Sequence, residues 1–227
     1  MTAIQTVRRV GLIGDVHCHD DVLRRSVNAI RELGVHDVFC VGDIVDGPGD
    51  ADSTIATLKE LNVECCAGNH ERWFLEGFLR DRKFATQTLN GESELFLRSL
   101  PRTRMFNTPV GGAMLCHAVG EDDESFLRPS TVGYALQDIA ELRRLMLDLD
   151  VQFLLCGHTH ERMVRAFTGL TVVNAGTIHA DFDASYCLID FDALTVTHYC
   201  ALADRFGEKI DIVSLPLPPP LPDLAAQ

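Results

Sequence analysis

Histidines and carboxylates gather in four short motifs of this 227-residue chain, and each motif directly follows an apolar run. The motifs are Gly14-Asp15-Val16-His17, Gly42-Asp43-Ile44-Val45-Asp46, Gly68-Asn69-His70-Glu71 and Gly157-His158-Thr159-His160, and a fifth apolar run ends at His117. Strands of one sheet would bring their ends, and hence these polar groups, to a common edge. Oxygen ligands and imidazoles that converge there are typical of a two-metal hydrolytic centre.

Spacing within the motifs supports this interpretation. Residues two apart in an extended segment project to the same side, so Asp15 and His17 can reach one metal ion, and so can His158 and His160. The other candidate ligands follow separate strands: Asp43, whose two oxygens could bridge two ions, Asn69 with its amide oxygen, and His117.

The elements that must position these groups begin with an alternation of strands and helices. Apolar runs predict strands at 7–13, 37–41 and 63–67, and helical spacing predicts helices at 20–33 and 51–61. A strand–helix–strand–helix–strand order indicates a parallel sheet with right-handed crossovers.

The rest of the chain is less regular. We expect helices at 70–82, 92–100 and 132–149, an antiparallel pair of strands at 104–106 and 112–117, a buried strand at 151–156, and short strands from Leu170 onward. A parallel beginning and an antiparallel end favour a four-layer αββα sandwich of two mixed sheets flanked by helices, with the metals at the sheet edge.

Composition narrows the classes of function. The net charge of −13 argues against a general nucleic-acid binder, which needs a basic surface. The N-terminus has no apolar stretch long enough for a secretory signal, and no run approaches a membrane span, so we expect a cytoplasmic protein without membrane association. In that compartment the eight cysteines would be reduced core residues.

The domain organisation follows from the same composition. We expect one domain over residues 1–214 and a proline-rich C-terminal tail over 215–227, which holds five of the nine prolines. Such a tail would be disordered or strapped to the surface, where it could cover an exposed strand edge. Homo-oligomerisation through the late strands or the tail is a further option.

Taken in order, the five motifs resemble those of the calcineurin-like metallophosphoesterases, over about residues 7–190. The short length and late strands are similar to the small bacterial and archaeal phosphodiesterase branch. The resemblance implies one metal held by Asp15, His17, Asp43 and His160, and a second held by Asp43, Asn69, His117 and His158. It also implies in-line attack by a hydroxide that bridges the two ions.

The resemblance also implies catalytic roles and cofactors. His70 matches the general acid that protonates the leaving oxygen, and Asp46 matches the carboxylate that orients its ring. The cofactors would be two divalent or transition metal ions, with Mn²⁺ first and Fe, Zn²⁺, Ni²⁺ or Co²⁺ as alternatives.

The chain departs from the family pattern at Gly47, where several relatives have an arginine. Without that phosphate-clamping group, phosphodiesters are favoured over dianionic monoesters. Arg72 could replace it, or could be a surface charge. His19 could contact the substrate, or could be a surface or helix-capping residue. His179 could also contact the substrate, or could be an ordinary loop residue.

We therefore predict a metal-dependent phosphoesterase that hydrolyses small phosphodiesters or phosphomonoesters. The alternatives are a protein serine/threonine phosphatase or a dinucleoside polyphosphate hydrolase and, from a different class, a non-catalytic scaffold with the same fold.

Overall fold

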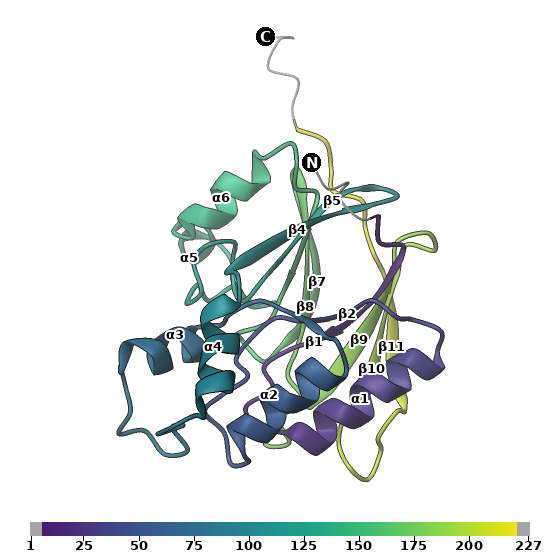
Figure 1. Cartoon of the computed structure of the whole chain (residues 1–227). Coiled ribbons are helices and arrows are strands. Elements are labelled where there is room, and N and C mark those ends of the chain that lie inside the picture. Colours follow the sequence, from purple (N-terminus) through teal and green to yellow (C-terminus); the bar gives the residue numbers. More distant parts are fainter. Residues whose placement is uncertain (1–5, 222–227) are drawn as a thin grey trace.

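Two mixed β-sheets pack face to face between helices in a computed structural model, which describes residues 6–221 (Figure 1). The first sheet has the order β11-β10-β9-β1-β2-β3 and the second β4-β5-β6-β8-β7. The bounds in the first sheet are β1 Arg9–Ile13, β2 Val38–Cys40, β3 Glu64–Cys65, β9 Ser185–Asp190, β10 Thr195–Cys200 and β11 Lys209–Ser214. Those in the second are β4 Thr103–Thr108, β5 Gly111–Cys116, β6 Phe153–Cys156, β7 Arg162–Phe167 and β8 Leu170–Ala175.

Each sheet contains a parallel core. In the first sheet β1, β2 and β3 run parallel, with Gly11 opposite Val38 and Phe39 opposite Glu64. In the second sheet β5, β6 and β8 run parallel. The remaining strands pair antiparallel, including β9 with β1 and β4 with β5. The predicted αββα sandwich of two mixed sheets is thus confirmed.

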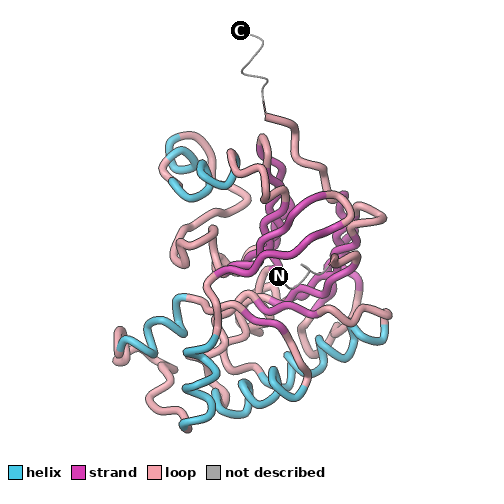
Figure 2. Tube along the Cα trace, turned by 45° about the horizontal axis from the view of Figure 1, so that its top comes forward, coloured by secondary structure: helices cyan, strands magenta, loops and turns pink. Residues whose placement is uncertain are grey.

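Alternation along the strands separates three hydrophobic cores. Leu12 faces the core between the two sheets, whereas Ile13 faces the core under the helices α1 (Asp20–Glu32) and α2 (Ala51–Glu60). On β6, Leu155 faces the inter-sheet core and Leu154 faces a third core. That third core lies beneath α6 (Ala140–Met146), which covers the outer face of the second sheet with α5 (Tyr134–Gln137), as Figure 2 also shows. Strands buried on both faces explain why their sequences are continuously apolar.

Two expected helices differ from the structure, and one strand of the structure is unexpected. The helix expected at 70–82 is α3 (Asn69–Glu76), which ends because Gly77 adopts a left-handed conformation with φ 70°. The helix expected at 132–149 is split into α5 and α6, and Leu147 and Leu149 are 70% and 76% exposed, so its apolar residues share no single buried face. Strand β7 was not expected at all. The helix α4 (Gly91–Ser99) lies close to its predicted position.

The proline-rich segment crosses from one sheet to the other. Leu215 is buried in the inter-sheet core, directly after β11. Beyond it, the carbonyl oxygens of Pro216 and Pro219 accept hydrogen bonds from Thr171 and Gly169 at the second sheet. Residues 222–227 of the predicted tail lie outside the described residues. Between residues 6 and 221, none of the helices is long and apolar enough to cross a membrane.

Candidate metal centre

The carboxyl ends of the parallel strands of both sheets meet at one edge of the sandwich. From the first sheet, Asp15 and His17 follow β1, Asp43 follows β2 and Asn69 follows β3. From the second sheet, His117 follows β5, and His158 and His160 follow β6. Ligand candidates that are up to 145 residues apart in the sequence, from Asp15 to His160, therefore lie together.

Tight left-handed turns direct these side chains inward. Asp15, His17, Asp43, His158 and His160 all have φ between 40° and 69°. Non-glycine residues adopt this conformation at a cost of about 1–3 kcal/mol each and do so mainly at functional sites. The turns are held by hydrogen bonds between loops, such as the backbone N–H of His17 donating to the carbonyl of Asp43.

One group of ligands consists of Asp15, His17 and His160. The Nε2 atoms of the two histidines are 3.3 Å apart, and Nε2 of His160 is 3.5 Å from a carboxylate oxygen of Asp15. Gly157 makes room for this arrangement, because a Cβ atom there would lie 2.5 Å from the other oxygen of Asp15.

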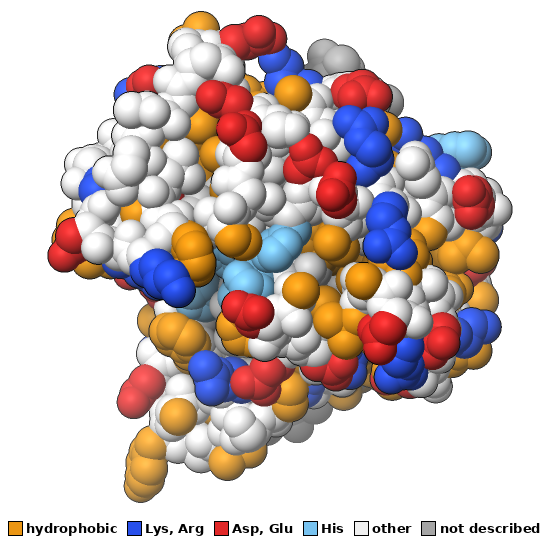
Figure 3. All heavy atoms as spheres, turned by 90° about the horizontal axis from the view of Figure 1, so that it is seen from below, with side chains coloured by type: hydrophobic (Ala, Val, Ile, Leu, Met, Phe, Trp, Pro, Cys, Tyr) orange, Lys and Arg blue, Asp and Glu red, His pale blue; other side chains and the backbone are white. Residues whose placement is uncertain are grey.

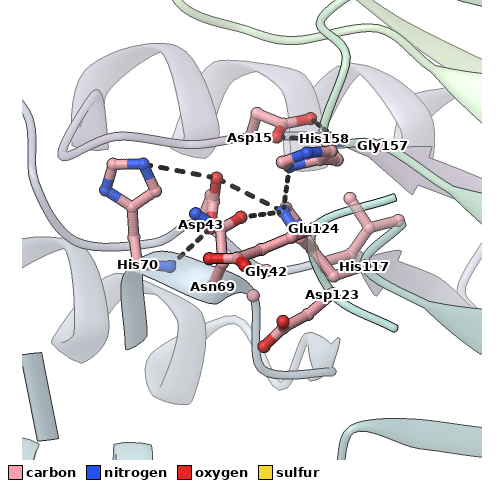
Figure 4. A network of polar contacts seen from close by, with 12 residues as sticks. Asp15, Gly42, Asp43, Asn69, His70, His117, Asp123, Glu124, Gly157 and His158 are labelled. Carbon is pink, nitrogen blue, oxygen red and sulfur yellow. Dashed lines mark hydrogen bonds and ion pairs between the residues drawn. The ribbon is translucent and has the colours of Figure 1, made fainter. Parts of the chain in front are cut away.

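The second group surrounds His117, which is 1% exposed. Its Nε2 atom lies 2.9 Å from Oδ1 of Asn69, 3.2 Å from Nδ1 of His158 and 3.3 Å from Oδ2 of Asp43. Figure 4 shows these side chains pointing toward one another, with Asp43 between His117 and His70. Oδ2 of Asp43 is also 3.8 Å from Nε2 of His17, so this carboxylate faces both groups.

Donor chemistry shows that a cation fits this centre. Nδ1 of His117 is 3.0 Å from the carbonyl oxygen of Val41, to which it donates, so once Nε2 has given up its proton this nitrogen presents a lone pair. That lone pair faces acceptors from three other side chains. Two clusters, Asp15–His17–His160 and Asp43–His117–His158, each keep their ligand atoms within 4.8 Å of one another. Nε2 of His158 is buried without a hydrogen-bond partner among the described residues.

The electrostatics of these side chains also favours a bound cation. Burial opposes ionisation of Asp43, but His117, His70 and His17 outweigh it and hold the pKa of Asp43 well below its usual range. Burial likewise opposes protonation of His117, yet Asp43 and Asp15 raise its pKa to about 10. Burial lowers the pKa of His17 to about 4, so this ring is neutral at pH 7 and able to ligate. The centre thus favours a bound positive charge, while the ring of His17 stays neutral and able to bind a metal ion.

His70 and Asp46 form a pair beside the two groups. Nδ1 of His70 is 2.9 Å from Oδ2 of Asp46, and its Nε2 is 3.8 Å from Oδ2 of Asp43. Burial disfavours the imidazolium, but Asp43 and the hydrogen bond to Asp46 raise the pKa of His70. Asp46 also accepts two hydrogen bonds from Arg80, at 2.9 and 2.8 Å, a contact that no motif indicated. Against burial, His70 and Arg80 lower the pKa of Asp46 to about 2.

Glu71, which belongs to the third motif, ties two ligand loops together. It is fully buried and accepts hydrogen bonds from the backbone N–H groups of Gly68, Asp43, Ile44 and Val45, at 2.7–3.1 Å. It therefore positions Asp43 without facing the centre itself.

The substitution Glu71→Gln should lower the free energy of unfolding by about 2–3 kcal/mol, because the new amide N–H₂ would face backbone donors in place of a carboxylate oxygen. Urea denaturation measures this change. Glu94→Gln, which removes an exposed i,i+4 ion pair, is the control and should change stability by less than about 0.5 kcal/mol. Equal stabilities of the two variants would show that Glu71 has no such role.

The three residues predicted to contact substrate have different positions. The guanidinium of Arg72 is held by Asp123, at 2.8 and 3.0 Å, and by Glu124, and the residue does not line the cavity above the centre. His19 stacks edge-on against His179 at 4.5 Å but lines a different surface depression. His179 does line the cavity, and its ring is 5.8 Å from that of His17. Of the three residues predicted to contact substrate, only His179 therefore lies beside the metal centre in the structure.

A cavity of about 330 Å³ opens above the centre. Figure 3 shows histidines at the bottom of a hollow with hydrophobic side chains around it. Six other residues of its lining are not picked out as site residues from the sequence: Trp73 on α3 and, on loops, Arg82, Lys83, Phe84, Phe126 and Phe182.

Comparisons with known proteins identify the fold. A family model for the calcineurin-like phosphoesterase superfamily domain matches residues 9–194. An uncharacterised protein of Methanocaldococcus jannaschii is 24% identical over 221 residues, covering 90% of this chain and 86% of that protein.

Solved structures show the same architecture. A hypothetical protein from Pyrococcus horikoshii has a TM-score of 0.68 at 16% identity, and a metallophosphoesterase from Sphaerobacter thermophilus has 0.62 at 21%. Each comparison covers 86% of this chain and 88% of the other. The family match over residues 9–194, which contain all five ligand motifs, means that the chain belongs to the calcineurin-like phosphoesterase superfamily.

Proposed function

We propose that this protein is a metal-dependent phosphodiesterase acting on small phosphorylated molecules. The observation that carries the proposal is the position of Asp43, whose Oδ2 lies 3.3–3.8 Å from nitrogens of His117, His17 and His70. A carboxylate that faces two ligand groups suits a two-ion centre, and a third histidine beside it suits proton transfer.

Two divalent ions held by these groups would lower the pKa of water and polarise the phosphoryl group. The chain itself supplies the proton. Because Nδ1 of His70 is bound to Asp46, its Nε2 can carry a proton at neutral pH and present it to the leaving oxygen. Hydrolysis breaks the P–O bond to the leaving alcohol and forms one to the oxygen of water; His70 protonates the alcohol and regains the proton that water releases.

A preference for diesters follows from the arginines near the centre. The chain has Gly47 where several relatives have an arginine, and both Arg72 and Arg80 are already held by carboxylates. No guanidinium from these positions is free to neutralise the second charge of a monoester, and Arg82, which also lines the cavity, stands over the ring of Trp73.

Hydrolysis of bis-p-nitrophenyl phosphate and p-nitrophenyl phosphate, with Mn²⁺, Ni²⁺, Co²⁺ or Zn²⁺ added, tests the proposal. We expect turnover of both esters and a higher kcat/KM for the diester. Absence of turnover with every ion would overturn the proposal. Measuring bound metal in the same samples then separates an inactive metalloprotein from a scaffold, which would retain well under one equivalent.

A further inference from the structure

Three exposed phenylalanines surround the mouth of the cavity above the metal centre. Phe84 comes from the α3–α4 loop, Phe126 from the β5–α5 loop and Phe182 from the β8–β9 loop, and their exposed fractions are 51%, 58% and 47%. Single exposed apolar residues are ordinary, but three rings gathered from separate loops around a charged centre indicate a binding surface.

Aromatic rings also lie directly against the histidines of the centre. The ring of Phe126 is 4.8 Å from that of His158, and the ring of Phe182 is 4.4 Å from that of His160. Trp73 is 4.7 Å from His70 and lines the same cavity. If a phosphate group is bound at the centre, its substituent extends towards the mouth of the cavity and therefore contacts these aromatic rings.

Two cations lie on the same rim. Arg82 stands over the ring of Trp73 at 5.1 Å, and Nζ of Lys83 lies 4.5 Å from the centre of the Phe84 ring. In the part of the chain that the structure describes, neither makes an ion pair, in contrast to Arg72 and Arg80. Phe84 has φ 65°, a conformation that bulky residues rarely adopt.

Resting on the proposed phosphodiesterase activity, we propose that this rim is a subsite for a nucleotidyl group. The base would stack on the rings from the three loops, and Arg82 and Lys83 would contact further phosphates of the substrate. A planar π-face next to several negative charges is the chemistry that aromatic rings and unpaired cations recognise together. The substrate class is thus nucleoside phosphodiesters and polyphosphates.

A matched pair of esters tests the subsite by activity. The p-nitrophenyl esters of thymidine 5′-phosphate and of ethyl phosphate share the bond that breaks and the leaving group, and differ only in nucleoside against ethyl. We expect kcat/KM to be at least about tenfold higher for the thymidine ester, mainly through KM. Phe126→Ala and Phe182→Ala should each reduce this ratio about fivefold or more, whereas Tyr134→Ala, which removes an 84% exposed ring outside the cavity, should leave it unchanged.

Direct binding gives a readout that does not depend on turnover. Trp73 is the single tryptophan of the chain, so its fluorescence reports on the rim alone. Titration with ADP should quench it saturably, Phe126→Ala and Phe182→Ala should raise the Kd about fivefold or more, and Arg82→Gln should weaken ADP binding more than AMP binding.

The outcomes separate the two proposals. If ADP binds with these changes but no ester is hydrolysed, the phosphodiesterase proposal fails and the subsite stands. A wild-type protein without preference for the thymidine ester, or without saturable quenching, overturns the subsite. So does an equal loss on both esters in the phenylalanine variants, because the rings would then only position His158 and His160.

Discussion

Replacing His70 by alanine should lower kcat by about 100- to 10,000-fold for a phosphodiester with an alkoxide leaving group. An alkoxide needs a proton as the P–O bond breaks, and Nε2 of His70 is the nitrogen beside Asp43 that can provide it. p-Nitrophenolate leaves without a proton, so bis-p-nitrophenyl phosphate should lose far less. Steady-state kinetics with both esters measures the difference.

The pH dependence of the same variant tests the assignment. Asp43 and Asp46 raise the pKa of His70 despite its burial, so the ring keeps its proton to a higher pH than a free imidazole does. A general acid works while it holds its proton; therefore kcat of the wild type should fall as pH rises through the pKa of His70. His70→Ala should lack this alkaline decline. The exposed His36→Ala is the control, and an unchanged decline in His70→Ala would show that another group is the acid.

A variant of Arg80 gives a second test of this pH dependence, because Arg80 and His70 both donate to the same carboxylate oxygen of Asp46. Oδ2 of Asp46 accepts from His70 at 2.9 Å and from Arg80 at 2.8 Å. Arg80→Gln removes a positive charge beside the imidazolium and should move the alkaline decline to higher pH. Arg98→Gln, which loses only an exposed ion pair with Glu94, should leave the profile in place.

Asp43→Asn should abolish measurable diesterase activity and reduce bound metal from about two equivalents to one or fewer. The carboxylate faces both ligand groups, and an amide cannot offer two anionic oxygens. The expected loss exceeds the roughly 100-fold that removal of a residue behind a metal ligand costs. Elemental analysis after dialysis against Mn²⁺, together with bis-p-nitrophenyl phosphate turnover, measures both effects.

Folding of this variant has a structural basis. Asparagine keeps the oxygen at the position of Oδ1, which accepts a hydrogen bond from the backbone N–H of His70. Circular dichroism and urea unfolding check that the fold is retained. Asp204→Asn alters an exposed carboxylate in the β10–β11 loop and serves as the control for charge. An active Asp43→Asn variant with full metal content would contradict a bridging role.

The sequence was most informative where burial and local signals agree. Strands β1, β2 and β6 are buried on both faces, and their continuous apolar runs predict them from the sequence alone. Helix α3 was overextended because the left-handed turn at Gly77 overrides the helical spacing beyond it. Strand β7, which pairs only with the antiparallel β8, has no clear strand signal because Arg162 and Arg165 interrupt its apolar residues.

For the functional site, the sequence by itself determined the family and the candidate ligands, because each ligand occupies a fixed place after a buried strand. Only the tertiary structure decided what surrounds them. Arg72 is held by Asp123, 51 residues away, and Asp46 is shared between His70 and Arg80. Phe84, Phe126 and Phe182 meet at one rim from three loops. Such contacts depend on how distant loops pack, and no local spacing encodes that packing.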